Sequence, residues 1–235
     1  DFRRAVLAKK PDLYILGEIW HTSQPWLQGD EFHAVMNYPL SESIKDYFLR
    51  QRKKIEQFIS EINSQSMYYK QQISEVMFNL LDSHDTERIL TTAKGNLQHV
   101  KAALTFLYLQ KGTPCIYYGT ELALIGGPDP DCRRVMPWDR VSEDNDMLNF
   151  MKKLIKVRKE VASIIQHGNY RLEEVKPDVL SLKWNYQGKE VQAIFNQSKE
   201  DFALNRDSVD LASHCQFEDG QQVILPDGFV VTVSK

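Results

Sequence analysis

Short apolar runs alternate with longer segments of helical periodicity over the first two thirds of the chain. Four apolar runs predict strands at residues 13–16, 32–38, 77–81 and 114–118. Apolar residues spaced by three and four predict helices at residues 41–62, 97–112 and 147–159, and residues 1–10 have the pattern of a helix that ends before Pro11. This alternation indicates a parallel sheet with helices outside it.

The pattern changes after about residue 165. Residues 180–184, 191–196, 222–225 and 229–233 predict strands separated by turns, and Pro226-Asp227-Gly228 predicts a hairpin turn. We therefore expect two domains, an α/β domain at residues 1–164 and a small antiparallel β domain at residues 165–235.

Polar residues follow the predicted strands directly. Glu18 and Trp20 follow the first, and Asp82-Ser83-His84-Asp85 follows the third. The carboxyl ends of parallel strands lie on one face, so we expect Glu18 and Asp85 to converge over one pocket. Two carboxylates beside a histidine and an aromatic ring suit glycoside hydrolysis, which needs an acid and negative charge near an oxocarbenium-like centre.

Each of these residues also has an ordinary interpretation. A lone carboxylate at a strand end is more often a helix cap or a salt-bridge partner, and Asp82 fits the role of ordering its loop. Trp20 and Trp26 equally suit packing. Spacing alone therefore indicates an α/β enzyme and leaves hydrolase as one option.

Composition excludes several classes of function. The net charge is −3, which gives no electrostatic reason to expect nucleic acid or an anionic membrane as a partner. No apolar run approaches the ~20 residues of a membrane helix. The 3 cysteines lack zinc-site spacing and suit a reducing compartment, so we expect a cytoplasmic protein without a disulfide framework.

Five motifs together resemble a known enzyme family. Residues 16–21 (LGEIWH) and 82–85 (DSHD) resemble two of the four signature regions of the α-amylase family, glycoside hydrolase family thirteen. Residues 36–39 (MNYP), 112–119 (GTPCIYYG) and 126–133 (GGPDPDCR) are similar to its neopullulanase, cyclomaltodextrinase and maltogenic amylase branch. The resemblance covers nearly the whole chain and is weakest after residue 165.

The resemblance implies a fold and three roles. The fold would be the second half of a (β/α)₈ TIM barrel, with strands five to eight, followed by a small antiparallel β-sandwich. Glu18 would be the general acid/base. Asp85 would hold the distorted sugar through its hydroxyls, and His84 would hydrogen-bond the same sugar.

The resemblance also implies how substrate is bound. Trp20 would line the acceptor side of the cleft, and Asp129 and Arg133 would touch the donor-side sugars. The substrates would be cyclodextrins, pullulan or maltodextrins, cleaved with retention at α-1,4 bonds, with α-1,6 bonds left open. Neither a redox cofactor nor a catalytic metal is implied. The family allows a structural calcium ion, but this sequence shows no acidic cluster that would hold one.

The family's nucleophile has no counterpart in this chain. It is an Asp at the end of the fourth barrel strand, two residues after an Arg, and would lie before residue 1. We therefore expect this chain to be inactive alone and to need an N-terminal half of the same enzyme; the full-length protein could be a homodimer. The alternatives are a non-catalytic carbohydrate-binding or scaffold fragment, and an unrelated α/β domain. An Arg-x-Asp just upstream would favour the enzyme.

A half-barrel should also leave its apolar interior uncovered. We expect the side chains of Ile15, Val35, Phe78, Leu80 and Ile116 either to be exposed in this chain when it is alone or to be paired elsewhere.

Overall fold

Four very short parallel strands organise the N-terminal part of the chain. The computed structural model describes residues 1–205, 209–218 and 220–234. The strands are β1 (Leu16–Gly17), β2 (Ala34–Val35), β3 (Phe78–Asn79) and β4 (Thr113–Pro114). β1 pairs with β2 and β3 pairs with β4, both in parallel, and a parallel bridge between Met36 and Phe78 joins the two pairs. The predicted parallel order is confirmed, although each strand is shorter than its apolar run.

Helices and short turns connect these strands. The helices are α1 (Phe2–Lys9), α2 (Tyr38–Ile44), α3 (Ile55–Ser66), α4 (Gln71–Ser74), α5 (Ile89–Thr92), α6 (Leu97–Tyr108) and α7 (Asp146–His167). Single turns of other helix types are η1 (Gln24–Leu27), the π-turn η2 (Lys45–Leu49), η3 (Thr120–Leu122), η4 (Asp131–Arg133) and η5 (Trp138–Arg140). None of the helices in the described part of the chain is long and apolar enough to cross a membrane.

The single helix predicted at residues 41–62 is wrong. α2 runs into η2, the helix then stops at Arg50, and α3 begins at Ile55. Gln51 has a φ of 50°, which no right-handed helix accommodates. Lys53, which lies in the break, pairs with Asp46 of η2 before it and with Glu61 of α3 after it. Both halves bury apolar residues, which is why their spacing looked continuous.

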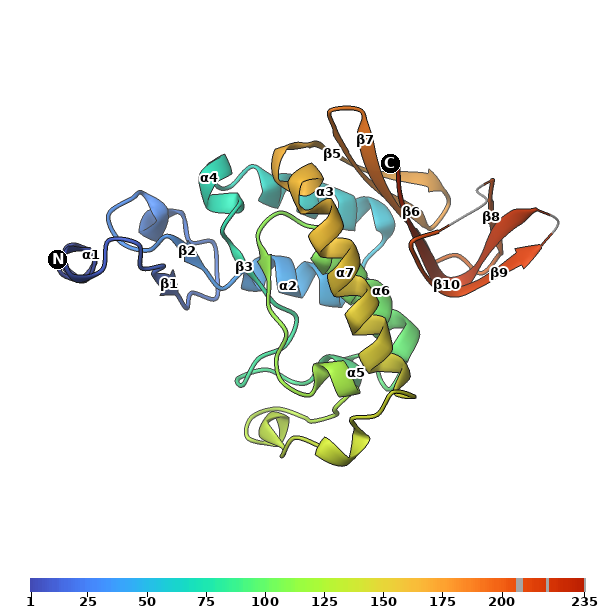
Figure 1. The fold of residues 1–235 in the computed structure, drawn as a ribbon, viewed down its shortest axis with the longest axis horizontal. Helices are drawn as coiled ribbons and strands as arrows, with labels where there is room; N and C mark the ends of the chain where they lie inside the picture. Colours follow the sequence, from blue (N-terminus) through green and yellow to red (C-terminus); the bar gives the residue numbers. More distant parts are fainter. Residues whose placement is uncertain (206–208, 219, 235) are drawn as a thin grey trace.

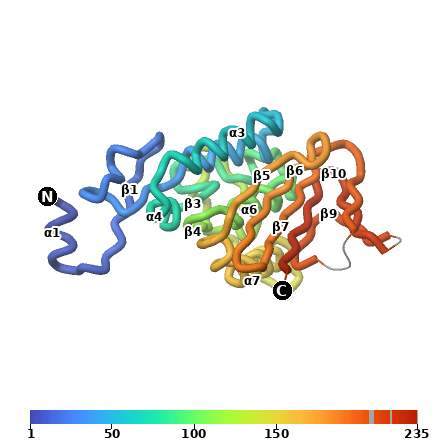
Figure 2. Tube along the Cα trace, turned by 90° about the horizontal axis from the view of Figure 1, so that it is seen from above, coloured from blue at the N-terminus to red at the C-terminus, as the bar shows by residue number. Residues whose placement is uncertain are grey.

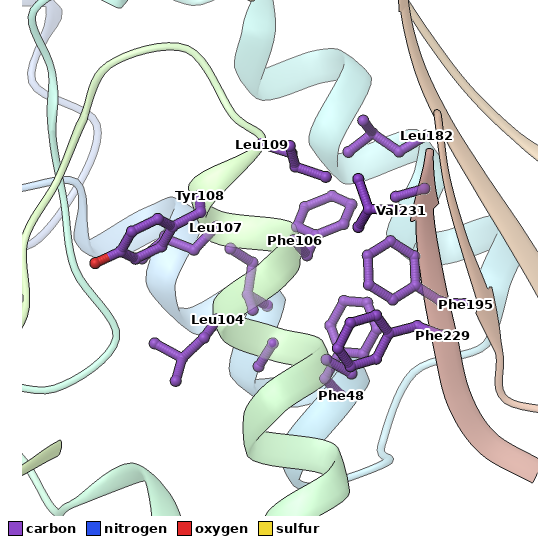
Figure 3. Packing of buried hydrophobic residues seen from close by; sticks show 14 of the residues in the cluster. Phe48, Leu104, Phe106, Leu107, Tyr108, Leu109, Leu182, Phe195, Phe229 and Val231 are labelled. Carbon is purple, nitrogen blue, oxygen red and sulfur yellow. The ribbon is translucent and has the colours of Figure 1, made fainter. Parts of the chain in front are cut away.

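α6 lies at the centre of the main hydrophobic core. Asn96 caps its first turn by accepting hydrogen bonds from the backbone N–H groups of Gln98 and His99, and ten of its twelve residues are buried. Phe106 forms a cluster of three neighbouring rings with Phe48 from the helical layer and Phe195 from the sheet (Figure 3). α6 therefore joins the helical layer to the C-terminal sheet.

The C-terminal part is one antiparallel sheet. Its strands are β5 (Asn169–Lys176), β6 (Val179–Tyr186), β7 (Lys189–Asn196), β8 (Phe202–Leu204), β9 (Leu211–Glu218) and β10 (Gln221–Val233). Their order is β5-β6-β7-β10-β8, and β9 pairs with β10. The sheet lies beside α6 and α7, at the opposite end of the molecule from α1 (Figures 1 and 2). A two-layered sandwich and a domain boundary at residue 164 stay predictions.

The hairpin predicted at Pro226-Asp227-Gly228 is wrong. β10 continues through these residues, and its register against β9 shifts between Ile224 and Phe229. Asp227 has a φ of 61°, and its carboxylate lies 3.1 Å from His99 Nε2 on α6. The turn-forming residues therefore make a bulge in one strand, fixed by a contact to the helical layer.

The apolar strand residues are largely covered. Ile15, Val35 and Leu80 are buried, and Phe78 and Ile116 are half-buried. Val35 belongs to a small apolar cluster with Leu27 and Met77, so loops and neighbouring strands cover it. Ile15, Val35 and Leu80 are therefore covered within this chain, the second of the two expected outcomes, while Phe78 and Ile116 stay partly exposed.

Candidate active site

The ends of β1 and β3 bring three predicted site residues together. Glu18 follows β1 directly, and His84 and Asp85 lie in the loop after β3. One side-chain ligand atom from each of these residues lies within 4.8 Å of those of the other two, and all three residues are exposed. Residues 66 positions apart in the chain thus meet on one face because their strands are parallel and share it.

Both carboxylate oxygens of Asp85 are engaged. His84 Nε2 lies 3.1 Å from Oδ2, and Arg133 Nη2 donates to Oδ1 at 3.1 Å. The Asp85 backbone N–H donates to Ser83 Oγ at 3.2 Å. Contacts on both sides fix the plane of the carboxylate before any substrate binds.

Arg133 connects Asp129 to this cluster. It lies in η4, and its Nε is 2.6 Å from Asp129 Oδ1. The same nitrogen donates to the backbone carbonyl of His84 at 3.0 Å. The structure therefore places both predicted donor-side residues next to Asp85, on the loop that follows β4.

Tyr38 contacts both Glu18 and Trp20. Its hydroxyl donates to Glu18 Oε1 at 3.3 Å, and the Trp20 ring stacks on the Tyr38 ring with centroids 3.7 Å apart and 9° between planes. Trp20 is 50% exposed, whereas Tyr38 is buried. Burial raises the pKa of Tyr38 to about 12, so its hydroxyl remains a donor at neutral pH.

Sequence reasoning did not assign a site role to Tyr38. The available signal was its position in the Met36–Pro39 motif, directly after β2 on the face where Glu18 was expected. A tyrosine at such a place suits packing as well, which is why its type alone carried no role.

Asp82 lies in the same loop as His84 and Asp85 but is buried. It accepts a hydrogen bond from Thr120 Oγ1 at 2.9 Å and another from the Ile89 backbone N–H at 3.3 Å. Burial raises its pKa to about 6, while these hydrogen bonds act in the opposite direction. Its contacts are those of a residue that orders the loops after β3 and β4.

The cluster lies on an open surface of this chain. Two cavities, of about 420 Å³ beside α3 and β5 and about 510 Å³ beside α1, are lined by other residues than Glu18, His84 and Asp85. Glu18, His84 and Asp85 are also spaced closely enough to hold a cation, but exposed acidic groups commonly share such spacing without one. The expectation of no metal ion stays a prediction.

A family model and individual relatives place this chain in the same family. The family model for the catalytic domain of α-amylase matches residues 1–209. The chain is 46% identical over 198 residues to an intracellular maltogenic amylase of Bacillus subtilis (strain 168), covering 83% of this chain and 34% of that protein. It is 48% identical over 164 residues to a cyclomaltodextrinase of a Bacillus species, covering 70% and 29%.

A solved structure agrees with this result over the whole chain. A cyclomaltodextrinase superposes with a TM-score of 0.85 at 36% identity, covering 100% of this chain and 42% of that one. This chain thus spans about a third of the length of the curated relatives named above. Because the family model matches most of the chain and the same fold recurs in that structure, the chain belongs to the α-amylase catalytic-domain family.

Proposed function

We propose that this chain is the second half of the barrel and the C-terminal domain of a retaining α-glucan hydrolase. The substrates are cyclodextrins, pullulan or maltodextrins, cleaved at α-1,4 bonds, and α-1,6 cleavage is tested on pullulan. In this proposal β1 to β4 are strands five to eight, residues 1–164 belong to the barrel and residues 165–235 form the second domain. The relatives' names, maltogenic amylase and cyclomaltodextrinase, support this substrate class.

One observation carries the proposal: Glu18 and Asp85 share a surface site in which their environments differ. Asp85 is held by His84 and Arg133, whereas Glu18 accepts one hydrogen bond from the neutral Tyr38 hydroxyl. A carboxylate between two potential cations suits charge stabilisation. A carboxyl beside a neutral donor suits proton transfer to and from the glycosidic oxygen.

The short separation argues against direct water attack by this pair. Inverting glycosidases keep their carboxyl groups about 6.5–9.5 Å apart to admit the attacking water. Oxygens of Glu18 and Asp85 lie within 4.8 Å. A separation this short is that of a retaining pair, so the distance alone does not choose between nucleophile and stabiliser for Asp85. The proposal assigns Asp85 to the sugar hydroxyls and takes the nucleophile from another part of the full-length protein because the family resemblance places it there.

The remaining site residues bind substrate in this proposal. Trp20 offers an exposed flat apolar face to the acceptor-side sugar. His84 hydrogen-bonds the sugar held by Asp85, and Arg133 and Asp129 contact the donor side. Before sugar binds, these groups satisfy one another, so substrate exchanges one set of hydrogen bonds for another.

The test compares this chain with the longer protein that carries it. The longer protein should release reducing sugar from cyclodextrin, maltodextrin and pullulan, and residues 1–235 alone should release none. An upstream Arg-x-Asp whose Asp→Asn variant is inactive would support the missing nucleophile. If the longer protein binds maltodextrin without cleaving it, the chain belongs instead to a non-catalytic carbohydrate-binding or scaffold protein.

Location and assembly are proposed with the activity. A curated relative is named intracellular, which supports a cytoplasmic enzyme. The partner of this chain would be the N-terminal half of the same polypeptide, and size measurement of the longer protein would test a homodimer.

A further inference from the structure

Arg88, three residues beyond Asp85, is a fully buried charged side chain. Its Cζ lies 4.0 Å from the ring centroid of Tyr117 and 4.6 Å from that of Tyr118. Burying a guanidinium is costly, and its Nη2 has no hydrogen-bond partner within the part of the chain that the structure describes. An apolar side chain of similar volume would avoid the cost of burying a charge, but it would leave the carbonyls of Cys132 and Tyr118 without the donors that Arg88 supplies. What Arg88 adds over an apolar residue is therefore the fixed position of these two carbonyls.

The hydrogen bonds that Arg88 donates all lead to the loop after β4. Its Nε donates to the Cys132 carbonyl at 2.7 Å, its Nη1 donates to the Tyr118 carbonyl, and its backbone N–H donates to the Gly126 carbonyl at 3.0 Å. One residue thus ties the segment that carries Asp85 to three points of the facing loop.

The Cys132 carbonyl belongs to the peptide bond that leads into Arg133. On the far side of this peptide, Arg133 reaches Asp85 Oδ1 and the His84 carbonyl, and the buried Cys132 thiol donates to the same carbonyl at 3.0 Å. Any shift of the Cys132 carbonyl therefore moves the Arg133 guanidinium relative to Asp85.

We propose that Arg88 is a positioning residue that holds Arg133 against Asp85 and so sets the donor-side wall of the cleft. This inference rests on the proposed function for its kinetic consequences. Lysine does not replace Arg88, because its tetrahedral ammonium reproduces neither the fixed spacing of the Nε and Nη1 donors nor the flat faces that lie against the two tyrosine rings.

The first test is a double-mutant cycle in the full-length protein. Arg88→Lys should lower kcat/KM on maltodextrin about tenfold. The fall in kcat and the rise in KM should contribute to this loss in the same proportion as they do in Arg133→Ala. In an Arg133→Ala background, the same substitution should cost less than about twofold. If Arg88→Lys lowers kcat/KM equally in the wild-type and Arg133→Ala backgrounds, the proposal is overturned. A fall in kcat with unchanged KM would also overturn it, because this result indicates that fewer molecules are folded.

Arg158 provides a matched control. It lies on α7 and donates to the carbonyls of Tyr108, Gln110 and Gly112, so Arg158→Lys also weakens a multidentate arginine. Its effect should add to that of Arg133→Ala. If Arg88→Lys does not fold, Tyr117→Leu provides a second variant, because it removes one of the two rings that contact the Arg88 guanidinium. Its effect on kcat/KM should be smaller and should also be non-additive with that of Arg133→Ala.

A second readout is independent of activity. Cys132 is fully buried, so its alkylation by iodoacetamide, followed by peptide mass spectrometry, reports movement of its loop. Arg88→Lys should accelerate labelling at least fivefold relative to Arg158→Lys. Equal labelling rates would overturn the positioning role. Accelerated labelling in a protein without glucan hydrolysis would retain this role of Arg88 and reject the proposed function.

Discussion

The Tyr38 hydroxyl lies 3.3 Å from Glu18 Oε1 and donates a hydrogen bond to it. Removing the hydroxyl with Tyr38→Phe keeps the ring on which Trp20 stacks. We expect kcat on maltodextrin to fall about three- to thirtyfold, the equivalent of one hydrogen bond to a catalytic carboxyl, with little change in KM. Steady-state kinetics of the full-length protein would test this.

The pH dependence provides a check on the Tyr38 prediction. The pKa of Tyr38 is raised to about 12, so its hydroxyl stays protonated throughout the working range. The ratio of the wild-type kcat to the Tyr38→Phe kcat on maltodextrin should therefore be constant between pH 5 and 9. A ratio that falls to one within this range would contradict donation by a neutral tyrosine.

Asp85→Asn should lower kcat much more than it raises KM. The substitution keeps the shape of the side chain but removes the negative charge that lies between His84 and Arg133. If Asp85 acts mainly in the transition state, kcat should fall by more than about a hundredfold. A change confined to KM would show that Asp85 only positions the substrate.

Asp82 should make stability fall as pH rises. Its folded pKa is about 6, above the ordinary value of 3.8, so the native state binds its proton more tightly. Stability from this group is therefore complete below pH 4 and is lost as pH rises to about 6, by on the order of 3 kcal/mol. In urea unfolding, Asp82→Asn should lack this loss. If the free energy of unfolding depends on pH in the same way in wild type and Asp82→Asn between pH 4 and 7, the raised pKa of Asp82 is contradicted.

Asp227 should have the opposite effect. The hydrogen bond from His99 holds the pKa of Asp227 below its usual range, with the charge of His214 acting in the same direction. This contribution is present above the ordinary carboxyl pKa and is lost as pH falls through the lower folded value. Asp227→Asn should destabilise the protein at pH 6 by less than about 1 kcal/mol, because the side chain is partly exposed. If the difference in free energy of unfolding between wild type and Asp227→Asn is the same at pH 3 as at pH 6, the lowered pKa of Asp227 is contradicted.

The sequence predicted the parallel strand order because each strand is a buried apolar run that ends in polar residues. It did not predict where helices break. The apolar spacing from Ile44 to Ile62 is helical on both sides of Gln51, and the break depends on a backbone conformation and on the ion pairs of Lys53. Likewise, Asp227 lies in a bulge because His99, 128 residues earlier, binds its carboxylate.

The candidate site was predictable where residue types carry the chemistry. Glu18, His84 and Asp85 lie together because strand ends share one face. Tyr38 was not assigned because a tyrosine in its motif suits packing as well as a site role. Arg88 was not assigned because its role depends on contacts between loops, which no periodicity encodes. The Arg88–Cys132 hydrogen bond, for example, joins residues 44 positions apart in two irregular segments.

The acid role of Glu18 is the central claim, and the most direct test is the dependence of Glu18→Gln on the leaving group. The full-length variant should lose about a thousandfold or more in kcat on maltodextrin, whose leaving sugar needs a proton. On α-maltosyl fluoride, whose leaving group needs little protonation, kcat/KM for fluoride release should stay within about tenfold of the wild-type value, because this constant ends at formation of the glycosyl-enzyme, before Glu18 must act as a base. On maltodextrin, kcat/KM should fall together with kcat. Equal losses on both substrates, or wild-type rates on maltodextrin, would contradict the assignment.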